Sequence, residues 1–178
     1  MILRKTNSIV SALIATFAFV LSTPLHAKDA QKVFDVLEYG AVGDCVTLDT
    51  PAIQRAIDAA AAAGGGARVR VHGGHRYLVG TLELRGGIDF HLDGGAELVV
   101  STNRADYRGD GVITALNAGH LRITGSGKIT GRSLDFMTGY DPKGEWWLFA
   151  EWRPKMFVLT GCNDLEIRDI TFGDAPYW

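Results

Sequence analysis

The apolar residues between Thr50 and Ala63 recur at the spacing of an α-helix and form one narrow stripe: Ile53, Ala56, Ile57 and Ala60. Thr50 is the expected N-cap, because its hydroxyl can accept a backbone hydrogen bond, and Pro51 suits the first helical position. Glycines 64–66 are expected to end the helix, because glycine adopts the left-handed conformation of a C-cap. We expect this helix to lie with its stripe against a flat apolar surface.

After residue 66 the pattern changes to short β-prone runs that are separated by glycine turns. The runs that we expect to form strands are Arg68–Val71, Tyr77–Leu84, Ile88–Leu92, Ala96–Val100, Val112–Leu116, Leu121–Thr124, Lys128–Thr130, Met156–Thr160 and Leu165–Phe172. Because no second helix is available to cross between parallel strands, a doubly wound sheet is excluded. An antiparallel sandwich and a solenoid of short strands remain. The similar stretches 121–125 and 128–131 favour stacked coils of a solenoid.

The start of the chain has the layout of a secretory signal peptide. Arg4 and Lys5 precede an apolar run, which is too short to cross a bilayer, and Ala27 is a plausible last residue before cleavage. These features predict a secreted or periplasmic protein. They divide the chain into a signal peptide (1–27), an N-terminal segment with the helix (28–66) and the strand-rich region (67–178).

Residues 34–66 carry the most informative motif. Phe34-Asp35-Val36 is followed by Tyr39-Gly40-Ala41-Val42-Gly43-Asp44 and then by Asp49, the predicted helix and its three glycines. This segment resembles the N-terminal cap of the pectate-lyase-like β-helix superfamily, which includes polygalacturonases, rhamnogalacturonases and some phage tailspikes. The resemblance implies an all-β, right-handed parallel β-helix. Its helix would cover the open apolar end of the solenoid, and residues 67–178 would form its first coils.

Later segments are similar to glycoside hydrolase family 28, which includes polygalacturonases. The matching stretches are 77–84, 92–98, 101–107, 123–131, Arg153-Pro154 and Pro176-Tyr177-Trp178. Asp174-Ala175 departs from the Asn-Ser that usually precedes the proline in that family. The departure weakens the substrate assignment but leaves the fold assignment intact.

The family resemblance implies inverting hydrolysis of a galacturonate-containing chain. In that chemistry one carboxylic acid protonates the leaving oxygen while another carboxylate activates water. The family signatures for these groups are Asn-Thr-Asp, Asp-Asp, Gly-His-Gly and Arg-Ile-Lys, and none of them occurs in this sequence. We therefore assign no catalytic residue, no metal and no cofactor, and expect the N-terminal part of a hydrolase, truncated on its C-terminal side. A β-helix lyase or epimerase, which would need calcium and a basic residue, and a non-catalytic carbohydrate-binding module remain alternatives.

The insertion from Ser133 to Trp152 is the best candidate for contact with a polysaccharide. Its aromatic residues are Phe136, Tyr140, Trp146, Trp147, Phe149 and Trp152. Aromatic faces can stack on sugar rings, and a cation such as Arg153 suits a uronate carboxylate. We expect most of these aromatics to pack against the solenoid and at least one of Trp146 and Trp147 to contact substrate.

Other clusters of polar residues are expected to be structural. His72 and His75, with His91 nearby, lack the further convergent groups that a metal site needs. Asp44 and Asp49 fit the turn before the helix. The aspartates at 164, 169 and 174 are an odd number of residues apart, and a strand would place them on alternate faces.

Composition limits the partners. The formal net charge of −2 argues against nucleic acid, because a phosphate binder needs a concentrated basic face. Cys45 and Cys162 could pair after export, although free, buried thiols are favoured. The expected partner is a pectin-like polysaccharide, without nucleic acid or membrane, and the full-length protein is expected to be a monomer.

A solenoid coil that nothing covers exposes apolar side chains and unpaired backbone groups. We therefore predict that the chain, expressed alone, hydrolyses no polygalacturonate and unfolds without a sharp transition. A reducing-end assay and a thermal melt of the purified chain check the two parts. Measurable hydrolysis contradicts the first part, and a cooperative melt of a monomer contradicts the second.

Overall fold

The computed structural model describes residues 30–177, and the described residues from Gln31 onward form one compact unit. The signal peptide predicted for residues 1–27 lies outside them. Sheet A contains β1 (Val33–Asp35), β3 (Arg68–Val71), β6 (Asp89–Leu92), β9 (Gly119–Gly125) and β14 (Asn163–Ile167). Sheet B contains β2 (Asp44–Leu48), β4 (Arg76–Val79), β7 (Glu97–Val100), β10 (Lys128–Thr130) and β15 (Thr171–Gly173). Sheet C contains β5 (Leu82–Glu83), β8 (Gly111–Leu116) and β13 (Lys155–Thr160).

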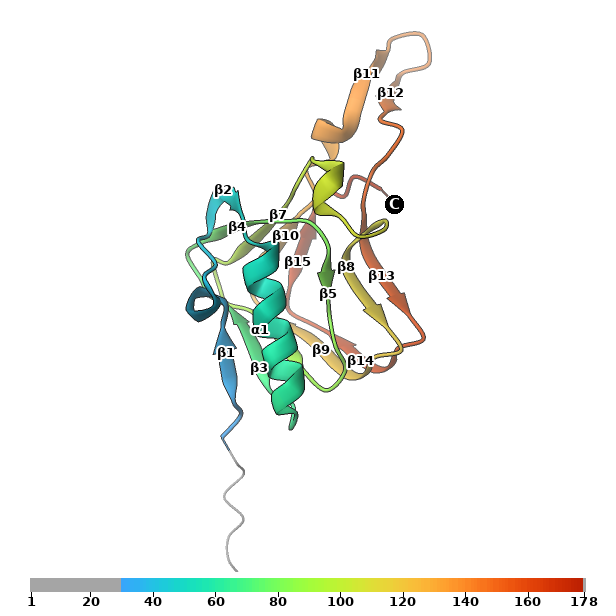
Figure 1. The fold of residues 1–178 in the computed structure, drawn as a ribbon. Helices are drawn as coiled ribbons and strands as arrows, with labels where there is room; N and C mark the ends of the chain where they lie inside the picture. Colours follow the sequence, from blue (N-terminus) through green and yellow to red (C-terminus); the bar gives the residue numbers. More distant parts are fainter. Residues whose placement is uncertain (1–29, 178) are drawn as a thin grey trace, which may run out of the picture. The chain divides into compact units, whose positions relative to one another are not determined.

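The three sheets are the faces of a parallel β-helix (Figure 1). The chain passes from sheet A to sheet B to sheet C and then returns to sheet A, one strand further along. Every strand pairing within these sheets is parallel, which excludes the antiparallel sandwich. The predicted solenoid is therefore confirmed.

The core is built from inward side chains that stack in register between successive coils. On sheet A, Val69 pairs with Phe90 and Phe90 pairs with Ile123, and all three are fully buried. On sheet B the corresponding stack is Tyr77, Leu98 and Ile129. Burying one large apolar side chain contributes about 1.5–3 kcal/mol, so these stacks are the main source of cohesion between coils.

Helix α1 (Thr50–Ala63) takes the place that a sheet C strand would have in the first coil (Figure 1). Its buried stripe is the predicted one with Ala52 added. The side chain of Gln54 pairs with the edge of β5: its Nε2 donates to the Glu83 carbonyl (3.0 Å), and its Oε1 accepts from the Glu83 amide (2.9 Å). A glutamine amide has the donor and acceptor of a peptide group, so Gln54 continues the ladder where no strand is present.

The start of the helix differs from the prediction by one residue. Asp49, not Thr50, occupies the N-cap position, and its buried carboxylate accepts from the amides of Val42 (2.7 Å) and Gly43 (3.1 Å) instead of capping the helix. Burial raises the pKa of Asp49, and these two hydrogen bonds oppose the increase. The Thr50 hydroxyl accepts from the amide of Gly80 (2.7 Å) and so ties the helix to the next coil. Gly64 ends the helix as expected, but with φ +63° and ψ −162° it does not adopt the left-handed helical conformation that was expected.

Two predicted strands are each divided by a corner of the solenoid. The run 77–84 splits into β4 and β5 around Gly80, where a Cβ atom would lie 1.9 Å from the Asp106 carbonyl oxygen. The run 165–172 splits into β14 and β15 around Asp169, which has φ +63°. The apolar alternation shifts by one residue at both corners, from Tyr77 and Val79 to Leu82 and Leu84 and from Leu165 and Ile167 to Ile170 and Phe172. The prediction overlooked this signal.

The similar stretches 121–125 and 128–131 were interpreted wrongly as stacked coils. The first is part of β9 in sheet A, and the second contains β10 in sheet B, so both belong to one coil. Strands β1 and β2 were not predicted, and they already place the 28–66 segment in sheets A and B.

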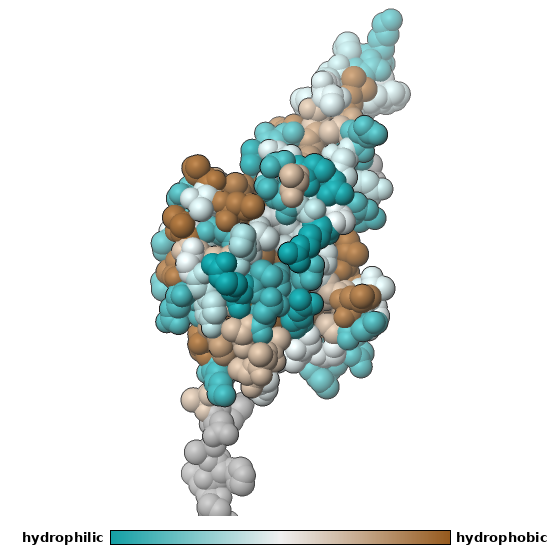
Figure 2. All heavy atoms as spheres, in the orientation of Figure 1, coloured by the Kyte–Doolittle hydropathy of each residue, from teal (hydrophilic) through white to brown (hydrophobic). Residues whose placement is uncertain are grey.

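Apolar surface remains at the last described coil. Ile167 and Phe172 are 40% and 46% exposed, although Ile123 and Ile129, on which they stack, are fully buried. A second apolar patch lies over β2, where Val46 is exposed (Figure 2). Among residues 30–177, no helix combines the length and the apolar character that crossing a membrane requires.

The Gln54 pairing leads to a prediction about stability. Gln54→Met keeps the length of the side chain but leaves the amide and carbonyl of Glu83 without their partners, which should cost about 1–3 kcal/mol of unfolding free energy. The measurement is chemical or thermal unfolding of the full-length protein, with Ala62→Gln at an exposed position of the same helix as the control. The control should lie within about 0.5 kcal/mol of the wild type. A Gln54→Met variant of unchanged stability would show that the pairing does not protect the edge.

Candidate functional site

One corner of the solenoid carries nearly all of its added length. Between sheets B and C, the first complete coil has only Gly80 and Thr81, the next has residues 101–110, and the third has residues 131–154. The corners that lead from sheet C back to sheet A stay short in every coil. Added chain at one corner builds a raised wall along one side of a sheet, here the side where the strands of sheet C begin.

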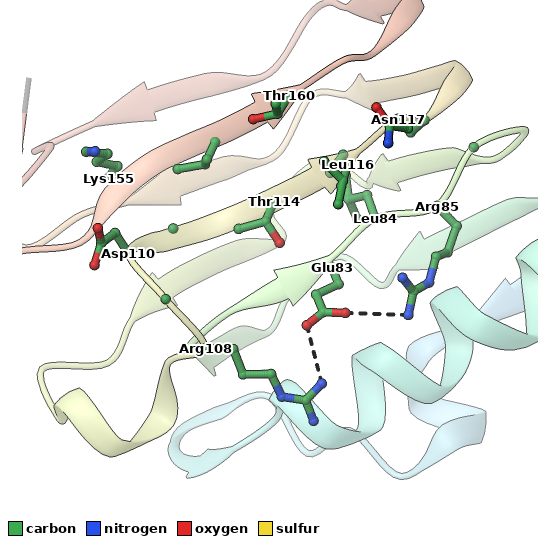
Figure 3. A pocket seen from close by; sticks show the side chains of 16 residues that line it. Glu83, Leu84, Arg85, Arg108, Asp110, Thr114, Leu116, Asn117, Lys155 and Thr160 are labelled. Carbon is green, nitrogen blue, oxygen red and sulfur yellow. Dashed lines mark hydrogen bonds and ion pairs between the residues drawn. The ribbon is translucent and has the colours of Figure 1, made fainter.

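A groove of about 560 Å³ lies over the outer face of sheet C (Figure 3). Its floor comes from all three strands of the sheet, and residues 108–111 and 116–118 close its two sides. The residues with charged or hydrogen-bonding side chains are Glu83, Arg85, Arg108, Asp110, Thr114, Asn117, Lys155 and Thr160. These side chains lie among apolar ones such as Leu116 and Val158.

Glu83 lies between two arginines in this groove (Figure 3). Its carboxylate is 3.3 Å from Arg108 Nη1 and 3.5 Å from Arg85 Nη2. Arg85 also donates from Nε to Asp58 on helix α1 (3.2 Å). With Lys155 the lining holds three cations and two carboxylates, Glu83 and Asp110. A guanidinium has five donors, so the exposed Arg108 can bind a ligand carboxylate while it stays paired with Glu83.

The loop 101–110 holds its shape through buried polar contacts. The Thr81 hydroxyl donates to the Gly111 carbonyl (2.7 Å) and accepts from the Arg108 amide (3.0 Å). Tyr107 donates from its hydroxyl to the Ser101 carbonyl, and burial raises its pKa well above the ordinary tyrosine value. Arg108 is thus presented to the groove from a fixed backbone.

The insertion 131–154 forms a projecting hairpin of β11 (Met137–Asp141) and β12 (Trp146–Phe149) after the short helix η3 (Ser133–Phe136) (Figure 1). Its base is packed: Trp152 stacks edge-on against Tyr107 (4.8 Å between ring centroids) and Phe136 (6.1 Å). Arg104 lies over the Trp152 ring at 4.7 Å. The base of the hairpin is therefore packed against the loop 101–110, which lines the groove.

The predicted contact residues lie on this hairpin and at its base. Trp146 and Trp147 are 58% and 48% exposed, and Tyr140 and Phe149 are exposed as well. The expectation that most of the aromatics pack against the solenoid is wrong: only Phe136 is buried and only Trp152 is half-buried. A two-stranded ribbon has no second layer to cover its faces, which explains the exposure.

Arg153 is held in a stack. Its guanidinium lies 3.9 Å from the ring centroid of Phe149 and 5.0 Å from that of Tyr177, and Nη1 donates to the Pro176 carbonyl (3.1 Å). Lys155 Nζ lies 5.7 Å from the same Tyr177 ring. Arg153 therefore joins the hairpin to the segment before residue 178 and lies next to the groove through Lys155.

The remaining polar clusters have structural partners. His72 Nδ1 is 2.9 Å from Asp35, and His91 Nδ1 is 2.8 Å from the Thr124 hydroxyl. Burial lowers the pKa of His91, and the charge of Arg68 lowers it further. Asp44 accepts from the amides of Thr47 and Val46, which lower its pKa. In the described part of the chain, no group of three or more His, Cys, Asp or Glu side chains is arranged to hold a metal ion.

The structure differs in part from the predictions for the three aspartates of the last coil and for the two cysteines. Asp164, Asp169 and Asp174 all have φ between +53° and +63°. Asp164 is the second residue of β14, whereas Asp169 and Asp174 lie at corners outside the strands. Cys45 and Cys162 are unpaired and half-buried, less buried than expected.

Similarity to known proteins was compared next. No protein-family model matches the chain. It is 43% identical over 76 residues to an exo-poly-α-D-galacturonosidase of Dickeya chrysanthemi, across 43% of this chain and 12% of that protein. It is 25% identical over 159 residues to a probable polygalacturonase of Arabidopsis thaliana, across 85% and 32% of the two chains. A mannuronan C5-epimerase of Azotobacter vinelandii is 41% identical over 73 residues, across 38% and 7%. The chain thus spans at most about a third of the length of these curated relatives.

Solved structures agree on the architecture. A family 28 exopolygalacturonase of Yersinia enterocolitica superposes with a TM-score of 0.67 at 22% identity, over 83% of this chain and 36% of that one. The chain has the right-handed parallel β-helix fold of the polygalacturonases. A candidate glycosyl hydrolase of Parabacteroides merdae has a TM-score of 0.69 at 29% identity, over 82% and 66% of the two chains. The resemblance to family 28 polygalacturonases found in the sequence is confirmed.

Sequence reasoning missed the groove of this polygalacturonase-like solenoid. Arg85, Arg108 and Lys155 are far apart in the chain and meet only because their coils stack. One available signal was the length between successive strands. The spacing grows through residues 101–110 and 131–154, which marks the corner where a wall forms.

The stacking of Arg153 predicts that it sets the position of the hairpin. Arg153→Ala removes two ring contacts and one hydrogen bond, so amide exchange in β11 and β12 should become about 5- to 30-fold faster. Hydrogen-exchange mass spectrometry of the full-length protein measures this, with sheet B as an internal reference. Lys143→Ala at the exposed tip of the same hairpin is the matched control and should leave exchange unchanged. Equal exchange in Arg153→Ala and wild type would mean that other contacts hold the hairpin.

Proposed function

We propose that the chain is the N-terminal part of a secreted hydrolase that cleaves glycosidic bonds in pectin-type, galacturonate-containing polysaccharides. The groove over sheet C is proposed to hold the polysaccharide, and the catalytic groups are proposed to lie outside residues 30–177. Similarity to an exo-poly-α-D-galacturonosidase and to a polygalacturonase supports the substrate class. The observation that carries the proposal is the presence of Arg108 and Lys155 in a groove that the loop 101–110 closes on one side.

The roles in the groove follow from its chemistry. A galacturonate chain carries one carboxylate on each sugar, so a binding surface needs cations at intervals and donors for hydroxyls between them. Arg108 and Lys155 supply the cations at the start of β8 and β13, and Thr114 and Thr160 supply hydroxyl groups further along these two strands. At least one of Trp146 and Trp147 is proposed to contact the substrate, and Arg153 to support that contact by holding the hairpin.

A second candidate is an epimerase or lyase that acts on another polyuronate. Similarity over 73 residues to a mannuronan C5-epimerase favours it. Both candidates require binding of uronate carboxylates, so the groove serves either one. Product analysis of the full-length protein discriminates between them: hydrolysis releases saturated reducing ends, elimination gives an unsaturated uronide, and epimerisation leaves the chain length unchanged.

The groove predicts charge-dependent binding. Replacing both cations, Arg108→Gln with Lys155→Gln, should weaken the affinity of the full-length protein for oligogalacturonate about tenfold or more, because two charge-assisted contacts are lost. Isothermal titration calorimetry measures this at low and high salt. Lys128→Gln on the outer face of sheet B is the matched control and should bind like the wild type.

Methyl-esterified oligogalacturonate gives a second comparison. Esterification removes the carboxylate charge, so the wild type should discriminate against the ester and the double variant should lose most of this discrimination. Equal affinity of wild type and double variant for the free acid would refute the assignment of the groove. An absence of any oligogalacturonate binding by the wild type would refute the proposed substrate class.

A further inference from the structure

The projecting hairpin of β11 and β12 has two different faces. In β12 the side chains alternate, so Trp147 and Phe149 lie on one face and Trp146 and Leu148 lie on the other. Tyr140 of β11 pairs with Trp147, and their rings meet edge-to-face at 5.4 Å. We name the first face the Trp147 face and the second the Trp146 face.

The Trp147 face is continuous with the groove. Phe149 of this face stacks on Arg153, Arg153 stacks on Tyr177, and Tyr177 lies beside Lys155. Lys155 also lines the groove. An unbroken line of aromatic and cationic side chains therefore runs from the wall of the groove out along the hairpin.

The residues around the Trp146 face differ from those around the Trp147 face. The Trp146 ring lies against its own turn: a Cβ atom added at Gly144 would be 2.8 Å from the indole carbons. Asp141 is the cross-strand partner of Trp146 and brings a carboxylate next to it. A polyanionic sugar chain would be repelled on this face, whereas the Trp147 face leads toward Arg153 and Lys155.

We propose that the Trp147 face is an extension of the groove that receives the sugars of a galacturonate chain too long for the groove itself. This inference rests on the proposed function and adds selection for chain length. The apolar faces of the sugar rings stack on Trp147 and Tyr140, while the carboxylates lie toward the cationic end of the line. Arg153 is a positioning residue here, since its guanidinium is stacked between Phe149 and Tyr177.

The experiment compares a galacturonate dimer with an octamer. Affinities of the full-length protein for both are measured by isothermal titration calorimetry for the wild type, Trp147→Ala, Trp147→Phe and Leu148→Ala. Trp147→Ala should weaken binding of the octamer about 3- to 10-fold and leave binding of the dimer unchanged, because only the longer chain reaches the hairpin. Trp147→Phe should keep most of the preference for the octamer. Leu148→Ala, at an exposed position of the Trp146 face, should bind both ligands like the wild type.

The outcomes separate this inference from the proposed function. If the wild type binds both oligomers and Trp147→Ala changes neither affinity, the extension does not exist, although the groove assignment stands. Equal losses for dimer and octamer, or an effect of Leu148→Ala as large as that of Trp147→Ala, also overturn the inference. A wild type that binds neither oligomer overturns the proposed function and the inference with it.

Discussion

The pairing between Gln54 and the edge of β5 is the contact on which the start of the solenoid depends. A parallel β-helix leaves unpaired backbone groups and an apolar interior at its first coil. Helix α1 solves both problems at once, since its alanine and isoleucine stripe covers the interior while Gln54 satisfies the backbone of Glu83. Thr50 and Asp49 add two further ties between the helix, its preceding loop and the next coil. Every later coil can then stack on a closed surface.

In-register stacking also decides what the outer faces can do. Each outward position of one coil lies directly above the same position of the next, so a side chain on the surface has neighbours from coils that are distant in sequence. The corner between sheets B and C is the one that lengthens, and its loops rise beside sheet C without disturbing the stacked core. The solenoid therefore supplies a regular floor, and the insertions supply the wall that makes a groove of it.

Features that depend on neighbouring residues, such as helix α1, could be predicted from the sequence. Features that depend on the stacking of coils, such as the groove, could not. The helical stripe and the three glycines were enough to place α1, because spacing and backbone freedom act within a few residues. The corners at Gly80 and Asp169 were missed although the apolar alternation shifts by one residue at each. Their physical cause is a close approach to another coil at Gly80 and a left-handed residue at Asp169. The strands of the hairpin were not predicted. The cations of the groove were missed because no local pattern joins Arg85, Arg108 and Lys155.

The distribution of charge gives a reason why a polyanion would bind on sheet C and not on sheet A. On the outer face of sheet A, Arg68 and Arg122 both lie within ion-pair distance of Asp89, and Arg70 lies 2.6 Å from Asp93. Burial pushes the pKa of Asp89 up, but hydrogen bonds from Thr124 and Arg68 and the nearby positive charges hold it below the ordinary aspartate value. Asp89 therefore stays charged, and its ionised form stabilises the fold at neutral pH, a contribution that is lost as the pH falls through its lowered pKa. The arginines of sheet A are thus committed to binding coils together, whereas the groove over sheet C holds Lys155 and the exposed Arg108, whose guanidinium has donors beyond its ion pair with Glu83.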